Sequence, residues 1–143
     1  MQLSTIIAAK GQFVATIQPD ASVADLVAML AEHRVGALVV SADGRTITGI
    51  VSERDVVRAL THGADVLSNP IASIMTTHVF SAPPEAHVEE LMHVMTDKHV
   101  RHIPVTDPEG ALLGIVSIGD VVKSRLGELE GERAALMEYI TRG

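Results

Sequence analysis

The chain has 143 residues and a formal net charge of −7, with 18 acidic and 11 basic side chains. This balance argues against a nucleic-acid backbone or an anionic membrane as the main partner, and the lack of cysteine excludes disulfides and thiolate chemistry. Met1–Lys10 lacks the basic start and long apolar stretch of a signal peptide. Since no apolar run approaches the ~18 residues of a bilayer span, we expect a cytoplasmic protein.

The sequence contains an internal duplication at an offset of 65 residues. Val14–Arg58 aligns with Val79–Lys123 without a gap, and 14 of the 45 aligned positions are identical, where composition alone would give about three. We therefore expect two packed units of one fold, with related clefts between them. The expected segments are an N-terminal segment with the first repeat (residues 1–65), the second repeat (66–125) and a C-terminal helical extension (126–143).

Hydrophobic periodicity and turn residues predict the same order of elements in both repeats. The first repeat is expected to form a helix with Ser22 as its N-cap, the strands Val35–Val40 and Thr46–Val51 around a turn at Ala42–Arg45, and a helix from Ser52 to about Thr61. Between the repeats, a helix is expected from Asn69-Pro70 to about Met75. The second repeat is expected to form a helix at Val88–Lys98, strands at Arg101–Val105 and Leu112–Val116, and a closing helix from Ser117.

The C-terminal segment carries an apolar seam whose residues follow one another at alternating steps of four and three positions. Arg133 occupies one position of this series and interrupts the seam. The seam consists of Val122, Leu126, Leu129, Leu136 and Ile140. Gly127 and Gly131 weaken this helix by about 1 kcal/mol each relative to Ala, so the seam is expected to need a partner surface. That surface is either the chain's own body or a second copy.

The motif with the most chemistry is Gly49-Ile50-Val51-Ser52-Glu53-Arg54-Asp55, which recurs as Gly114-Ile115-Val116-Ser117-Ile118-Gly119-Asp120. In each copy a buried strand ends and a helix begins, so free amide hydrogens favour anions and polar oxygens there. The carboxylate can accept hydrogen bonds from two ribose hydroxyls, and the serine can donate to a ribose oxygen or a phosphate. Alternatively, Ser-x-x-Asp is a capping box. The two roles are compatible.

These motifs, preceded by His33-Arg34-Val35-Gly36-Ala37-Leu38-Val39-Val40 and by Val100-Arg101-His102-Ile103-Pro104-Val105, resemble a tandem pair of CBS domains, named for cystathionine β-synthase. The resemblance covers roughly Lys10–Arg125. It implies an α/β (α+β) fold of two pseudo-twofold-related β-α-β-β-α units packed through their sheets. It also implies a stand-alone regulatory (Bateman) module that binds adenine nucleotides in the clefts between the units.

The resemblance, carried over position by position, implies two nucleotide clefts. The Asp120 cleft would use Asp120, Ser117 and Ile115, with Val35, Gly36 and Ala37 from the other repeat, Gly11–Ala15 beside the base, and Arg101 and His102 on the phosphate. The Asp55 cleft would use Asp55, Ser52 and Ile50, with Thr77, His78, Val79 and Val100 around the base. The equivalents of Arg101 and His102 in the first repeat are Gly36 and Ala37. The Asp55 cleft would therefore depend on Arg54 or on a residue across the interface, and we expect the Asp120 cleft to bind more tightly.

The function expected from these features is a non-catalytic sensor of AMP, ADP or ATP that changes shape or assembly as a homodimer and acts on a downstream protein. NAD(H) and S-adenosylmethionine are alternative ligands of the same clefts, and a purely structural interaction module is the alternative of another class. No catalytic constellation is found in the sequence, and the seven histidines lack the spacing of a metal site. We therefore expect no catalytic cofactor and no bound metal, with nucleic acid and membrane unlikely as partners.

Overall fold

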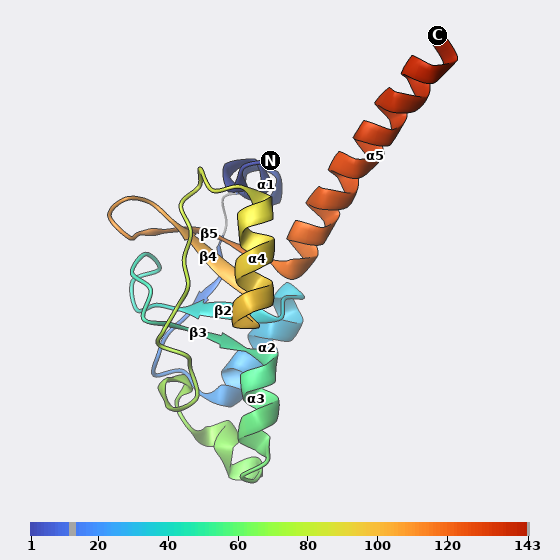
Figure 1. Cartoon of the computed structure of the whole chain (residues 1–143). Helices are drawn as coiled ribbons and strands as arrows, with labels where there is room; N and C mark the ends of the chain where they lie inside the picture. The colour runs from blue at the N-terminus through green and yellow to red at the C-terminus, as the bar shows by residue number, and fades with distance from the viewer. Residues whose placement is uncertain (12–13, 143) are drawn as a thin grey trace.

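The computed structural model describes residues 1–11 and 14–142 of the chain. Its elements are α1 (Leu3–Lys10), β1 (Thr16–Ile17), α2 (Val23–His33), β2 (Ala37–Val40), β3 (Gly49–Ser52), α3 (Glu53–Leu60), η1 (Ala64–Ser68), η2 (Ile71–Ser73), α4 (Val88–Lys98), β4 (His102–Thr106), β5 (Leu112–Ser117) and α5 (Ile118–Arg142). Figure 1 shows the first repeat below the second, and α5 projecting away from both.

The first repeat is a small sheet with its two helices. Strand β2 pairs in parallel with β1 and antiparallel with β3, in a register that sets Ala37 opposite Ser52. Helix α2 begins with the predicted capping box, in which Ser22 Oγ accepts from the amide of Asp25 at 3.0 Å and the Asp25 carboxylate accepts from the amide of Ser22 at 3.2 Å. Its apolar stripe buries Val23, Leu26 and Leu30, and each buried side chain of this size contributes about 1.5–3 kcal/mol.

The turn between β2 and β3 is held by Asp43. Its carboxylate accepts hydrogen bonds from the amides of Thr46 at 2.7 Å and Arg45 at 2.8 Å, and from the hydroxyl of Ser41 at 3.0 Å. These bonds favour the ionised form and hold the pKa of Asp43 well below its usual range. The next residue, Gly44, has a φ of 78°, which glycine adopts without strain. This arrangement explains why the predicted turn forms at Ala42–Arg45.

The second repeat has the same order of elements. An isolated parallel bridge between Ala82 and Val105 stands where the first repeat has β1, and β4 and β5 form an antiparallel pair beside α4. The predicted mixed α/β class and the β-α-β-β-α order are confirmed. The helix predicted from Asn69 to Met75 is wrong. Only the short 3-10 helix η2 forms there, because Thr76 leaves the helical path and exchanges backbone hydrogen bonds with Ile50 at 2.9 Å in both directions.

Each repeat has its own hydrophobic core, and helix α1 belongs to the second. Leu3 and Ile6 are buried with Val88, Ile103 and Val116, whereas the core of the first repeat contains residues from β1 through η2. The amide of Leu3 donates to the carbonyl of Ala86 at 2.9 Å. Helix α1 was not predicted from the sequence. Its packing holds its C-terminal end, at Lys10, beside the second repeat.

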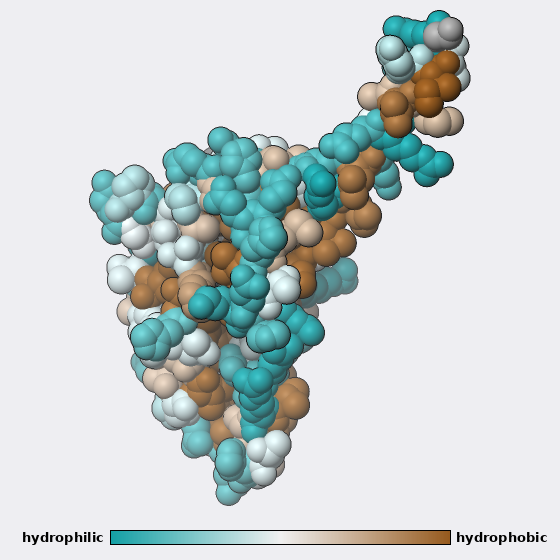
Figure 2. Space-filling model, in the orientation of Figure 1, coloured by the Kyte–Doolittle hydropathy of each residue, from teal (hydrophilic) through white to brown (hydrophobic). Residues whose placement is uncertain are grey.

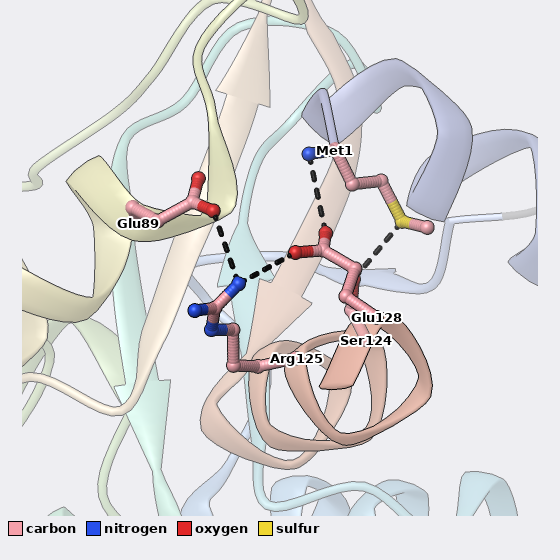
Figure 3. Close-up of polar contacts among 5 residues, drawn as sticks. All are labelled: Met1, Glu89, Ser124, Arg125 and Glu128. Atoms are coloured by element: carbon pink, nitrogen blue, oxygen red, sulfur yellow. Dashed lines mark hydrogen bonds and ion pairs between the residues drawn. The ribbon is translucent and has the colours of Figure 1, made fainter. Parts of the chain in front are cut away.

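A cluster of charges ties the start of α1 to α5. Glu128 lies 3.2 Å from the amino group of Met1 and 2.9 Å from Arg125, and Arg125 also lies 3.6 Å from Glu89 on α4 (Figure 3). The hydrogen bond from the Met1 amino group, followed by that from Arg125, lowers the pKa of Glu128. The cluster joins α1, α4 and α5 on one side of the second repeat.

The outer part of α5 leaves its apolar seam exposed. Leu136 and Ile140 are 60% and 61% exposed, and Figure 2 shows apolar side chains along the projecting end of the helix. Packing of the outer seam on the chain's own body, one of the two alternatives, is therefore wrong. The outer part of α5 extends away from the body of the protein (Figure 1).

Candidate nucleotide site

A cavity of about 650 Å³ lies at the start of α3, between the two repeats. This volume is in the range of small-molecule sites. Its described lining consists of Gly36, Ala37, Ile50, Ser52, Glu53, Arg54, Asp55, Val57, Arg58, Thr76, His78, Val79, Phe80, Lys98, His99, Val100, Arg101 and His102. Residues of both repeats therefore meet around Asp55, and we call this space the Asp55 cavity.

Ser52 and Asp55 form the predicted capping box inside the cavity. Asp55 Oδ2 accepts from the amide of Ser52 at 2.8 Å and from its hydroxyl at 3.1 Å, while the amide of Asp55 donates to Ser52 Oγ at 3.3 Å. All three bonds to Asp55 are local, and those to its carboxylate use Oδ2. An ionised carboxylate has about four lone-pair sites, so Oδ1 can accept hydrogen bonds from a ligand while Oδ2 caps the helix.

Gly36, Ala37, Arg101 and His102 were expected at the Asp120 cleft, and all four line the Asp55 cavity. The β4–β5 register also sets His102 opposite Ser117, so His102 lies beside both motifs, and the expected role of these residues at the Asp120 cleft stays a prediction. Ala37 lines the Asp55 cavity because the β2–β3 register sets it opposite Ser52. His102 lies there because Gly36 leaves room for it. A methyl group on Gly36 would come within 3.3 Å of the His102 ring and 3.3 Å of the Glu53 carboxylate.

The cavity wall is cationic in an otherwise acidic protein. Four basic side chains line it, namely Arg54, Arg58, Lys98 and Arg101, against the two carboxylates of Glu53 and Asp55. The sources of positive charge expected for the Asp55 cleft were Arg54 or a residue across the interface, and both kinds line the cavity, the second as Arg101 and Lys98. Arg101 itself was expected at the cleft of its own repeat, and it lines this cavity because it lies just before β4.

His102 is half-buried in this wall. Burial lowers the pKa of His102 below its ordinary value, and the nearby Lys10 and Arg101 add to this effect, while Glu53 and Asp120 oppose it. The imidazole is therefore held mainly neutral near pH 7. An anion bound beside it would favour the protonated form.

The second copy of the motif is arranged differently. Ser117 and Asp120 form the equivalent cap, with the amide of Ser117 2.9 Å from Asp120 Oδ2 and the amide of Asp120 3.1 Å from Ser117 Oγ. Lys10 Nζ, at the end of α1, donates to the same Oδ2 at 2.7 Å and to the carbonyl of Ile115 at 2.8 Å. Burial alone would raise the pKa of Asp120, but the bonds from Lys10 and Ser117 outweigh it and lower that pKa.

The remaining predicted residues divide between inside and outside the cavity. Of the residues expected in this cavity, its lining includes Ile50, Ser52, Arg54, His78, Val79 and Val100, and Thr77 is not among the described lining residues. Val35, Gly11 and Ala15 were expected at the Asp120 cleft and do not line this cavity. Of the segment expected beside the base, residues 12 and 13 lie outside the described residues. Sequence reasoning missed seven of the described lining residues, namely Glu53, Val57, Arg58, Thr76, Phe80, Lys98 and His99. Most of them lie next to a predicted residue in the sequence, as Phe80 follows Val79 and Lys98-His99 precedes Val100, and Arg58 lies one helical turn after Asp55.

Comparisons with known proteins decide the family. A profile of the CBS domain matches the chain twice, at residues 12–62 and 71–127. The chain belongs to the CBS-domain family. The mitochondrial CBS domain-containing protein CBSX3 of Arabidopsis thaliana is 39% identical over 129 residues, which cover 87% of this chain and 62% of that protein. The chain thus spans less than two thirds of that relative's length.

Solved structures show the same fold. The CBS-domain containing protein ATU1752 from Agrobacterium tumefaciens is 38% identical, with a TM-score of 0.83 over 87% of this chain and 99% of that one. The CBS domain pair of protein MJ0100, solved in complex with 5′-methylthioadenosine and S-adenosyl-L-methionine, is 23% identical, with a TM-score of 0.76 over 88% of this chain and 98% of that one. CBS domain pairs are regulatory modules, and the present chain is such a pair.

Two further observations describe the surface and the side-chain clusters. Within residues 1–11 and 14–142, no helix is both long enough and apolar enough to cross a membrane. In the same part of the chain, no group of three or more histidine, aspartate or glutamate side chains is arranged to hold a metal ion.

Proposed function

We propose that this CBS pair is a non-catalytic sensor that binds an adenine nucleotide in the Asp55 cavity. One observation carries the proposal: a capped carboxylate with a free face opens into the same cavity as four basic side chains. Carboxylate and cations together match a ribose that carries phosphate. The ligands of MJ0100, which are adenosine derivatives, support the same class.

Each part of the ligand has a matching group. Asp55 accepts the ribose hydroxyls through Oδ1, and Ile50, Val79 and Val100 offer apolar contact to the base. Arg54 and Arg101 are the candidates for phosphate, because guanidinium groups bind phosphate oxygens in pairs. With four bases around the cavity, ADP and ATP should bind more tightly than AMP, and S-adenosylmethionine, which carries a positive charge, should bind less tightly. NAD(H) is retained as an alternative, because its pyrophosphate meets the same cations.

The proposed regulatory effect follows because both repeats contribute residues to the cavity wall. Asp55 lies on the first repeat and Arg101 on the second, so a ligand that contacts both favours one relative position of the repeats. A ligand shifts such an equilibrium only by its differential affinity for the two states. The expected cytoplasmic location stays a prediction, since one relative is named as mitochondrial.

The expected homodimer has a surface that suits it. Helices α2 and α3 expose Val27 and Val57, at 43% and 64%, and α4 and α5 expose the residues 65 positions later, Met92 and Val122, at 38% and 49%. The two repeats thus present matching apolar patches, and a twofold dimer needs a self-complementary surface of this kind. A V57E/V122E variant should elute as a monomer in light scattering, with R45E in the β2–β3 turn as the control. A dimer in both variants would contradict the proposed surface.

Thermal unfolding against AMP, ADP, ATP, NAD⁺ and S-adenosylmethionine tests the proposed ligand. A ligand at 100 times its dissociation constant stabilises the folded state by about 2.7 kcal/mol, which gives a clear shift of the melting temperature. We expect shifts in the order ATP or ADP, then AMP, with S-adenosylmethionine last. If none of these ligands shifts the transition, the structural interaction module becomes the better description, with the Ser-x-x-Asp motifs as helix caps only.

A further inference from the structure

We propose that Lys10 closes the Asp120 cleft to nucleotides, so that each chain binds one nucleotide, in the Asp55 cavity. The inference rests on the proposed function and concerns which of the two clefts can serve it. Its basis is the contact between the Lys10 ammonium group and Asp120 Oδ2, at 2.7 Å. A ribose bound at Asp120 would have to compete with this ammonium group.

The first repeat provides an internal reference for this contact. The residue 65 positions after Lys10 is Met75, which carries no charge, and within the described part of the chain Asp55 has no ion pair. The carbonyl of Ile50 is bonded by the backbone amide of Thr76, whereas the equivalent carbonyl of Ile115 is bonded by the Lys10 side chain. One lysine therefore replaces a backbone contact and also neutralises the carboxylate.

Lys10 is held in place by the rest of its helix. Leu3 and Ile6 are buried in the second core, and the terminal methyl group of Ile7 lies where a side chain on Gly114 would lie. Lys10 is the last residue of α1, where a cation is favoured by the helix dipole. The ammonium group is thus presented by a packed helix.

The lowered pKa of Asp120 supports the same conclusion. The carboxylate is stabilised in its ionised form by the Lys10 hydrogen bond although burial opposes ionisation. The Lys10 ammonium group therefore already balances the charge of the Asp120 carboxylate, which the ribose of a nucleotide would meet in this cleft. The duplicated motif has therefore diverged in use: one copy faces an open cavity, and the other anchors the N-terminal helix.

Isothermal titration of the full chain with ADP tests the proposal through stoichiometry. Wild type should bind one ADP per chain. K10M, which replaces the ammonium group with an uncharged side chain of similar length, should bind two, and K10M/D120N should return to one. Lys10 is exposed enough (39% for its side chain) that K10M is expected to fold, and a melting curve of each variant checks this. K10Q serves as a second variant with a neutral polar side chain.

The possible results separate this proposal from the proposed function. Two sites in wild type, or one site in both K10M and K10Q, would overturn the role of Lys10 and leave the Asp55 site standing. Weaker binding in K10M would also overturn it, because Lys10 would then be a phosphate ligand. If wild type binds no ADP and K10M binds one, the Asp55 site fails while the closing role of Lys10 holds. If neither wild type nor any variant binds ADP, both the proposed Asp55 site and the proposed role of Lys10 are wrong.

Discussion

The Asp55 cavity and the Asp120 cleft share one motif and differ in what faces it. Both have a serine cap and a carboxylate with the same local hydrogen bonds. Around Asp55 the neighbours are four cations of both repeats and an open space of about 650 Å³, whereas Asp120 faces the ammonium group of a helix from the same chain. Similar local chemistry therefore faces an open cavity in one place and an ion pair in the other, according to its tertiary neighbours.

The strongest way to break this comparison is to remove each carboxylate in turn. D55A should weaken ADP binding by more than about tenfold, since hydrogen bonds to a charged group contribute on the order of 1.5–3 kcal/mol. D120A should leave ADP affinity within about twofold. Titration calorimetry measures both. Both variants lose the acidic member of a capping box, and D120A also loses the ion pair with Lys10, so a melting curve of each variant separates a loss of affinity from a loss of stability. A greater loss of affinity in D120A would reverse the assignment of the clefts.

Gly49 and Gly114 occupy equivalent positions in the two motifs, and an alanine at each position tests how tightly that motif is packed. A methyl group on Gly49 would lie 2.8 Å from the carbonyl oxygen of Thr76, a backbone atom that cannot rotate away. A methyl group on Gly114 would meet the end of the Ile7 side chain, which can turn. We expect overpacking costs of about 1–3 kcal/mol, with G49A at the upper end and G114A at the lower. Urea unfolding of both variants gives the difference, and equal costs would show that α1 is as rigid as the backbone at Thr76.

The cationic wall is tested by comparing ligands that differ in phosphate number. R101Q should weaken ADP binding by about tenfold, on the order of one charged hydrogen bond, and should weaken adenosine binding much less. R125Q, which removes an arginine engaged with Glu128 outside the cavity, is the matched control. Fluorescence competition with a labelled ADP gives both affinities. An equal loss for adenosine would mean that Arg101 contacts the nucleoside or supports the fold.

The smallest expected effect is the pH dependence from His102. Its pKa is lowered in the free protein by burial, and a phosphate nearby would raise it, so ADP binding takes up a proton and affinity should rise two- to threefold as the pH falls from 8 to 6. H102Q should reduce this slope. His78 and His99 also line the cavity, so H78Q and H99Q measure their share. An unchanged slope in H102Q would place the phosphate elsewhere.

The same lowered pKa has a separate consequence for folding. Because neutral His102 is favoured only in the folded state, its contribution to the free energy of unfolding is complete above the ordinary histidine pKa. It is lost as the pH falls below that value, since the unfolded chain then binds the proton first. H102Q without ligand should therefore lose stability less steeply between pH 7 and pH 5 than wild type, as urea unfolding would measure.

The sequence by itself determined the features that depend on neighbouring residues. The order of helices and strands and the caps at Ser22, Ser52 and Ser117 follow from residues within a few positions of one another. The duplication follows from aligning the sequence with itself at an offset of 65 residues. Hydrophobic period and cap chemistry act over one or two turns. For the same reason the motif that resembles a CBS domain could be found without a structure.

Only the tertiary structure decided which copy of the motif is open. Lys10 is 110 residues from Asp120 in the sequence, and Arg101 joins the cavity of the other repeat because β4 begins at the interface. The helix expected after Asn69 also gave way to a long-range backbone pairing between Thr76 and Ile50. Local patterns carry no information on such encounters, since a side chain's electrostatic neighbours depend on how the two repeats and α1 pack together.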